Sequence, residues 1–152
     1  MKTFLVKQKF RLGGERFAIK DDRGEIAYQV EGSFFKIPKT FTIYDAAGEQ
    51  VSQISKEILT LLPRFEIQLR DGSSWRDKYE FDNLGLRIEG NIWDLNFKLL
   101  DDRDQLIAEI KKELFHLTST YTVTVLEDAY ADLVISLCVA IDYVEILESQ
   151  SH

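Results

Sequence analysis

Apolar and polar residues alternate with a period of two along most of this chain of 152 residues. Such alternation is typical of strands that bury one face in an antiparallel sheet. It predicts strands near residues 3–12, 16–21, 25–32, 38–44, 50–56, 64–70, 74–81, 84–90, 95–101, 106–113 and 119–126. No linker or change of composition divides them, so we expect residues 1–152 to form a single domain.

A short cassette recurs along these strands. It consists of an aromatic residue, any residue, then Ile, Leu or Val, followed by a turn, and the clearest copies are 17–24 and 41–48. Both end in an acidic turn closed by glycine, which adopts positive φ without steric cost, so each predicts a β-hairpin. The copy at 97–104 has Asp104 in place of the glycine. The repetition predicts an antiparallel meander.

The alternation stops in the last quarter of the chain. Residues 129–148 contain neither Gly nor Pro, and the run Leu133–Ile141 is apolar apart from one serine. As a helix of about 30 Å, this segment would be apolar nearly all round and would need burial on every side. The alternative is a buried strand over 133–141, because Val and Ile favour strands.

The apolar helix selects among β-rich architectures. A β-sandwich core is about 10 Å thick and leaves no room for a helix, whereas a closed barrel has an interior to fill and no exposed edges. We therefore predict a mainly β fold, a closed antiparallel β-barrel of about twelve strands around a central hydrophobic C-terminal helix at 129–148.

The net charge of −7 is unevenly distributed. Seven of the 26 acidic residues and none of the 19 basic residues follow Lys112, so the first 112 residues carry 19 of each sign. A pI near 4.9 disfavours nucleic acid as a partner, because duplexes need an extended basic face. The apolar run is too short to span a bilayer, and no signal peptide is evident. We expect a cytoplasmic protein with no transmembrane segment.

Few residues offer catalytic chemistry. Hydrolysis needs a nucleophile, a base and an orienting group in mutual reach. His116 is the one histidine inside the chain, since His152 ends it, and Cys138 lies in the apolar run, where burial raises the pKa of a thiol. We expect no enzymatic activity, no catalytic residues and no cofactor.

Two acidic clusters, 21–22 and 101–104, lack the ligand spacing of a calcium loop, so hairpin turns explain them better than a metal site. Trp75 and Trp93 lie outside any basic-aromatic motif, which favours packing over ligand stacking. Asp142, on the predicted helix, either anchors the helix end to a barrel residue or is solvated at the barrel mouth.

Three segments resemble the LURP-one-related family, whose fold is grouped with the tubby C-terminal domain and the phospholipid scramblases. They are Phe41-Thr-Ile-Tyr-Asp-Ala-Ala-Gly48, Ile107-Ala-Glu-Ile-Lys-Lys112, and the ending from Tyr121-Thr-Val-Thr-Val125 through 133–142. The resemblance implies a closed barrel around a central helix. It also implies an association with membranes, because tubby domains bind phosphoinositides through basic side chains. No basic motif of that kind is evident in this chain.

The first strand holds the candidate lipid-binding residues. Period-two alternation places Lys7, Lys9 and Arg11 on one face, where each would contribute about 1 kcal/mol at an anionic membrane surface. A charged outer face that keeps the strand soluble is the alternative. We expect a non-enzymatic binding or scaffold domain with anionic phospholipid headgroups as its partner, or else a protein-interaction adaptor that binds no lipid.

Overall fold

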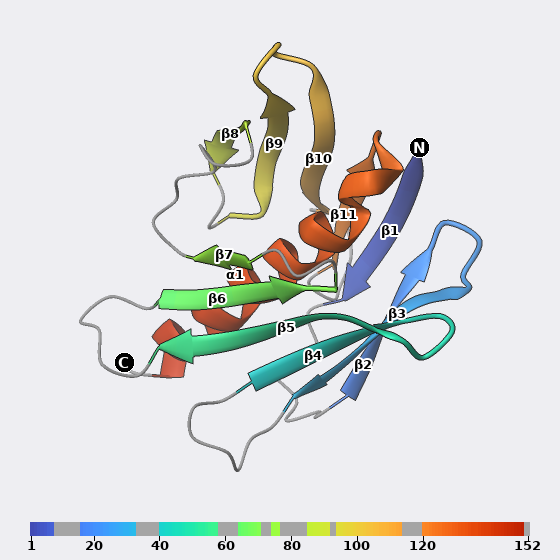
Figure 1. The fold of residues 1–152 in the computed structure, drawn as a ribbon, viewed down its shortest axis with the longest axis vertical. Helices are drawn as coiled ribbons and strands as arrows, with labels where there is room; N and C mark the ends of the chain where they lie inside the picture. The colour runs from blue at the N-terminus through green and yellow to red at the C-terminus, as the bar shows by residue number, and fades with distance from the viewer. Residues whose placement is uncertain are drawn as a thin grey trace.

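The computed structural model describes residues 1–7, 16–32, 40–57, 64–70, 74–76, 85–91, 94–113 and 120–150. For Lys7 and for residues 55–57, 64–69, 74–76, 113 and 142–150 it describes the backbone alone. The strands are β1 Lys2–Lys7, β2 Arg16–Asp21, β3 Ile26–Gly32, β4 Thr40–Asp45, β5 Gln50–Glu57, β6 Arg64–Leu69, β7 Ser74–Arg76, β8 Leu86–Asn91, β9 Asn96–Asp101, β10 Leu106–Glu113 and β11 Thr120–Val125. A 3-10 turn at Asp128–Tyr130 leads into the helix α1, Ala131–Gln150 (Figure 1).

The eleven strands of the described residues belong to one antiparallel sheet, in the order β7-β6-β5-β4-β3-β2-β1-β11-β10-β9-β8. Strands β1 to β7 pair in chain order, and so do β8 to β11, as the predicted meander requires. The pairing of β1 with β11 joins these two runs and aligns Lys2 with Val125 and Lys7 with Thr120. The first and last strands therefore lie side by side in the middle of the sheet, and both arms of the sheet extend from them.

The closed form of the predicted barrel is not confirmed. β7 and β8 are the two end strands of the pairing order, and no ladder between them is found in the part of the chain that the structure describes. The sheet bends around α1, which contacts β5, β6 and β11 (Figure 1). The described residues form a single bent antiparallel sheet of eleven strands with one C-terminal helix, and a closed barrel of about twelve strands is not confirmed.

The predicted helix is confirmed, two residues further along than 129–148. Every residue from Leu133 to Ile141 is buried. A half-buried helix leaves one side exposed, so this continuous burial shows that the helix is covered on every side along this stretch. The alternative of a buried strand over 133–141 is wrong, because these residues are helical. Apolar side chains of the strands pack in one core with those of the helix. These strand side chains are the inward residues of alternating positions, such as Phe4, Val6 and Ile19.

The acidic clusters are turns, as predicted. An aspartate opens three hairpins: Asp21, Asp45 and Asp101. In each, its Oδ1 accepts the backbone N–H of the residues two and four positions later, at 2.8–3.0 Å. Glycine occupies the positive-φ position of the first two hairpins, and Asp104, with φ 63°, occupies it in the third. Asp reaches this region more readily than most residues, which explains why one copy manages without glycine.

Candidate functional site

The predicted lipid-binding residues lie at the limit of what the structure describes. The backbone of Lys7 ends β1, while Lys9 and Arg11 lie outside the described residues. The alternation on which their common face was predicted holds as far as β1 can be followed, since Val6 is buried and Leu5 is 42% exposed. The structure therefore neither brings the three basic side chains together nor separates them.

Most of the other residues that the sequence singled out are not placed either. His116 and Trp93 lie outside the described residues, and Trp75 and Asp142 are described by their backbone alone. Cys138 is buried in the middle of α1, as expected for a thiol that packs as a small hydrophobic group.

The structure brings together a set of polar residues that the sequence analysis did not single out. Arg70, directly after β6, donates from Nε to Oδ2 of Asp132 in the first turn of α1, at 3.1 Å. Its Nη1 donates to Oδ2 of Asp45 at the end of β4, also at 3.1 Å, and lies 3.8 Å from Oε2 of Glu49. Tyr28, on β3, donates its hydroxyl to Oδ1 of Asp132 at 3.0 Å. We call Tyr28, Asp45, Arg70 and Asp132 the Arg70 cluster.

Local structure holds each member of the Arg70 cluster in place. Tyr28 and Asp45 are direct cross-strand partners of the β3–β4 ladder. Asp45 uses its two oxygens separately, Oδ1 for its own turn and Oδ2 for Arg70. The backbone N–H of Arg70 donates to the carbonyl of Val51 at 2.9 Å, which holds Arg70 against β5. Asp132 lies at a helix N-terminus, where the helix dipole favours a negative charge.

Burial and charge set the protonation of the cluster. Burial raises the pKa of the Tyr28 hydroxyl far above its ordinary value, and the neighbouring Asp132 carboxylate raises it further. Tyr28 therefore stays a hydrogen-bond donor over the physiological range. The backbone N–H of Glu49 and the Arg70 guanidinium lower the pKa of Asp45, which keeps that carboxylate charged.

A second polar contact joins α1 to the sheet. The hydroxyls of Ser136 and Ser52 on β5 lie 2.6 Å apart, both side chains are buried, and Ser136 also donates to the backbone carbonyl of Asp132 at 2.7 Å. Asp132 and Ser136 are four residues apart and therefore share one face of the helix. Asp132 and Ser136 are the charged residue and the hydroxyl residue of the otherwise apolar or thiol-bearing stretch 131–141. Their i, i+4 spacing is the sequence signal that could have predicted a polar contact between this helix face and the sheet.

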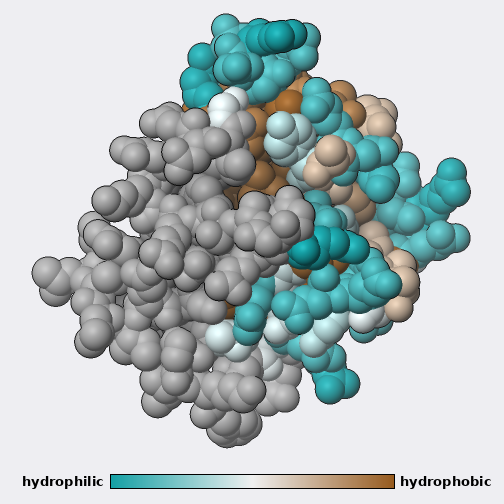
Figure 2. All heavy atoms as spheres, in the orientation of Figure 1, coloured by the Kyte–Doolittle hydropathy of each residue, from teal (hydrophilic) through white to brown (hydrophobic). Residues whose placement is uncertain are grey.

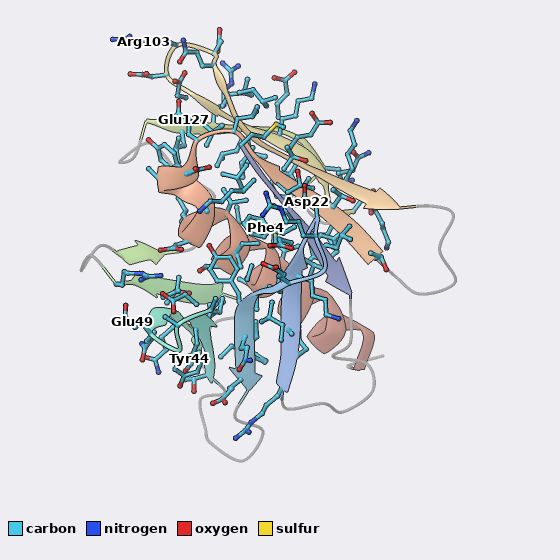
Figure 3. All side chains as sticks on the ribbon, turned by 90° about the vertical axis from the view of Figure 1, so that its right-hand side faces the viewer. Phe4, Asp22, Tyr44, Glu49, Arg103 and Glu127 are labelled. Carbon is cyan, nitrogen blue, oxygen red and sulfur yellow. The ribbon has the colours of Figure 1, made fainter. Side chains whose placement is uncertain are left out.

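A hollow of about 780 Å³ lies beside the Arg70 cluster. Its wall is formed by residues 1–4, by the β2–β3 hairpin, by the β4–β5 turn, and by Arg70 and Asp132. Phe4 and Asp22 both line it, and Figure 3 labels both in the middle of the face that it shows. Ligand sites usually measure about 300–1,000 Å³, so this hollow could admit a small molecule or a few side chains of a partner.

The rim of the hollow is partly apolar. Met1 is 79% exposed and Ile26 is 44% exposed, and both line the hollow. Leu126, 38% exposed, follows Val125, the strand partner of Lys2. These are three of the four large apolar side chains that are exposed in the described part of the chain. Figure 2 shows such apolar surface between the hydrophilic hairpin tips.

Both signs of charge line the hollow, with acidic groups in excess. The carboxylates are those of Asp21, Asp22, Glu25, Asp45 and Asp132. The cations are the side chains of Lys2, Arg23 and Arg70 and the ammonium of Met1. Among the described residues, no group of three or more His, Cys, Asp or Glu side chains could hold a metal ion, and no helix is long and apolar enough to cross a membrane.

A solved structure shares this fold, and the sequence has relatives among known proteins. An X-ray structure of a protein from Arabidopsis thaliana superposes with a TM-score of 0.66, at 15% identity, over 94% of this chain and 90% of that one. The uncharacterised protein YxjI of Bacillus subtilis (strain 168) is 26% identical over 140 residues, which cover 83% of this chain and 86% of YxjI. The profile of the LURP-one-related proteins matches residues 2–142. A match over nearly the whole chain shows that this protein belongs to the LURP-one-related family.

Proposed function

We propose that this protein is a non-enzymatic binding domain whose ligand or partner occupies the hollow beside the Arg70 cluster. The observation that carries the proposal is the hollow itself, since a concave surface that brings polar and apolar side chains together is typical of binding sites. The Arg70 cluster supports it, because this cluster joins β3, β4, the end of β6 and α1 and so pre-organises the walls.

The pairing of the polar groups supports a binding role over a catalytic one. The Tyr28 hydroxyl is committed to Asp132, and burial keeps it protonated, so it is poorly suited to act as a base or nucleophile. Arg70 is shared between two carboxylates. Groups paired in this way hold a surface in shape, whereas a catalytic group needs a reactive atom free to meet the substrate.

Blocking the hollow tests this proposal. Ala47 lines it from the β4–β5 turn, and Ala47→Trp would fill part of it. Arg103 occupies the same position in the β9–β10 turn, away from the hollow (Figure 3), so Arg103→Trp is the matched control. Fragments and peptides are screened by amide NMR shifts. We expect to find ligands that shift the amide signals of the residues lining the hollow. Their affinity should be lower for Ala47→Trp and unchanged for Arg103→Trp. Ligands that bind both variants equally, or no ligand at all, would contradict the proposal.

Binding of anionic lipid headgroups through Lys7, Lys9 and Arg11 is the second candidate function. The exposed Leu5 beside the buried Val6 supports an outward face on β1 for such contacts. Liposomes with and without anionic lipid provide the test, because electrostatic binding weakens as the Debye length falls from about 10 Å at 0.1 M salt to about 3 Å at 1 M. No co-sedimentation at low salt, or co-sedimentation unchanged in the Lys7→Ala/Lys9→Ala/Arg11→Ala variant, would refute it. An adaptor that binds protein alone is the alternative.

We also propose that the sheet closes between β7 and β8 into the tubby-like barrel that the resemblance implies. The burial of α1 on all sides from Leu133 to Ile141 supports closure. Hydrogen exchange tests it. Successive amides of β8 point alternately toward β9 and away from it. In a closed barrel both groups of amides exchange slowly, because the second group donates to β7. Fast exchange of the amides that point away from β9 would mean an open edge.

A further inference from the structure

We propose, resting on the proposed binding function, that the occupant of the hollow is a protein segment that presents Lys or Arg next to apolar side chains. Three features of the described residues carry this inference: the excess of acidic groups around the hollow, the carboxylates that have no partner, and the extent of the apolar rim.

The charge around the hollow is negative once its rim is included. Five carboxylates line the hollow, and two more adjoin it: Glu49 pairs with Arg70, and Asp128 pairs with the Met1 ammonium. Against these seven acidic groups stand three basic side chains and one ammonium, which leaves an excess of three negative charges. A surface of this sign attracts a basic partner and speeds its association.

The pairing of the charges shows where that excess is available. Arg70 is occupied by Asp45 and Asp132, and the Met1 ammonium lies 3.6 Å from Asp128. The side-chain carboxylates of Asp22 and Glu25, on the exposed tip of the β2–β3 hairpin, make no ion pair or hydrogen bond with the described residues. These two carboxylates are therefore the ones best placed to receive a cation from a partner.

The apolar part of the surface favours a protein segment over a small amine. Small ligands bury about 70–90% of their surface in their pockets. Here the exposed apolar surface continues from Met1 and Ile26, which line the hollow, to Leu126, which lies outside it. An occupant that contacts Met1, Ile26 and Leu126 together therefore extends beyond the hollow. A peptide that alternates cationic and apolar side chains can contact the hairpin carboxylates and this rim together.

Fluorescence anisotropy with defined peptides tests the inference. The probe is a fluorescein-labelled hexapeptide, Lys-Leu-Lys-Phe-Lys-Leu, compared with peptides in which Glu replaces each Lys or Ser replaces each apolar residue. The test variant is Asp22→Asn/Glu25→Gln. The control, Asp102→Asn/Glu89→Gln, removes the same charge from exposed positions that do not line the hollow. Circular dichroism confirms that both variants fold.

We expect the Lys peptide to bind the wild type more tightly than either altered peptide. Its Kd should rise about five- to tenfold in the test variant, as for the loss of two rim charges, and less than about twofold in the control. Ile26→Ser should weaken binding equally at low and high salt, because the contact that it removes is apolar.

Several results would overturn the inference. Equal binding of the Lys and Glu peptides, equal loss in the test and control variants, or no binding of the Lys peptide would each do so. Octylamine binding as tightly as the peptide would exclude a protein segment as the required occupant. If a different ligand bound the hollow and Ala47→Trp removed it, the inference would fail while the proposed function stood. If no ligand bound the hollow, both would fail.

Discussion

Asp132 is the residue whose loss should show most directly how the helix is held in the sheet. Its carboxylate accepts the Tyr28 hydroxyl on one oxygen and Arg70 on the other. In Asp132→Ala the largely buried Tyr28 hydroxyl loses a charged acceptor, which costs about 1.5–3 kcal/mol. The ion pair with Arg70 adds at most about 1 kcal/mol, because the two side chains are 39% and 33% exposed. The helix-dipole interaction adds about 0.3–1 kcal/mol.

These contributions share one carboxylate and are not additive, so we expect a loss of about 2–4 kcal/mol in the free energy of unfolding. For a domain of this size, that corresponds to a fall in Tm of about 5–15 °C. Urea unfolding followed by circular dichroism measures it. Asp132→Asn, which keeps an acceptor for Tyr28, should lose less.

Asp128→Ala is the matched control. Asp128 precedes the same helix by one turn and forms an ion pair with the Met1 ammonium, but its side chain is 56% exposed. Surface changes of this kind cost within about 0.5 kcal/mol. If Asp132→Ala were as stable as the wild type, or if Asp128→Ala cost as much as Asp132→Ala, the reasoning that the Arg70 cluster anchors α1 would be refuted.

Three further predictions concern the core and the cluster. The pKa of Tyr28 is raised in the folded protein, so its contribution to stability is fully present below the unfolded tyrosine pKa of about 10 and is lost as pH rises above it. Urea midpoints measured from pH 8 to 11 should therefore fall more steeply for the wild type than for Tyr28→Phe. Parallel curves for the two proteins would contradict this prediction. Ser136→Ala should lower the free energy of unfolding by about 1–3 kcal/mol, because it leaves the buried Ser52 hydroxyl without this partner. Adding Ser52→Val should recover part of that loss. If the losses of the two single variants simply added in the double variant, the contact would be contradicted. Val139→Asp places a lone charge in the core and should abolish the cooperative melting transition, so a sharp native-like transition would contradict the buried helix.

The strands, the hairpin turns and the helix could be predicted from the sequence because each depends on short-range patterns. The Asp-x-x-Gly turns at 21–24 and 45–48 hold their own hydrogen bonds within four residues. The helix at 131–150 follows from a long apolar run without Gly or Pro, which leaves burial on all sides as its stable arrangement. Strand alternation likewise needs no knowledge of partners.

The candidate site depends instead on contacts between residues distant in the sequence. Arg70 lies 25 residues from Asp45 and 62 from Asp132, and Tyr28 lies 104 from Asp132. Nothing local distinguishes Arg70 from the other basic residues of the strands; it becomes an anchor because the sheet carries the end of β6 to the start of α1.

The sequence by itself determined the approximate positions of the strands and of the helix, and that the apolar helix must be enclosed, because backbone periodicity and the hydrophobic effect act through near neighbours and composition. Only the tertiary structure decided the pairing of β1 with β11, the Arg70 cluster and the hollow. These depend on which strands meet, and many alignments of amphipathic strands satisfy the same local pattern until the whole sheet packs around the helix.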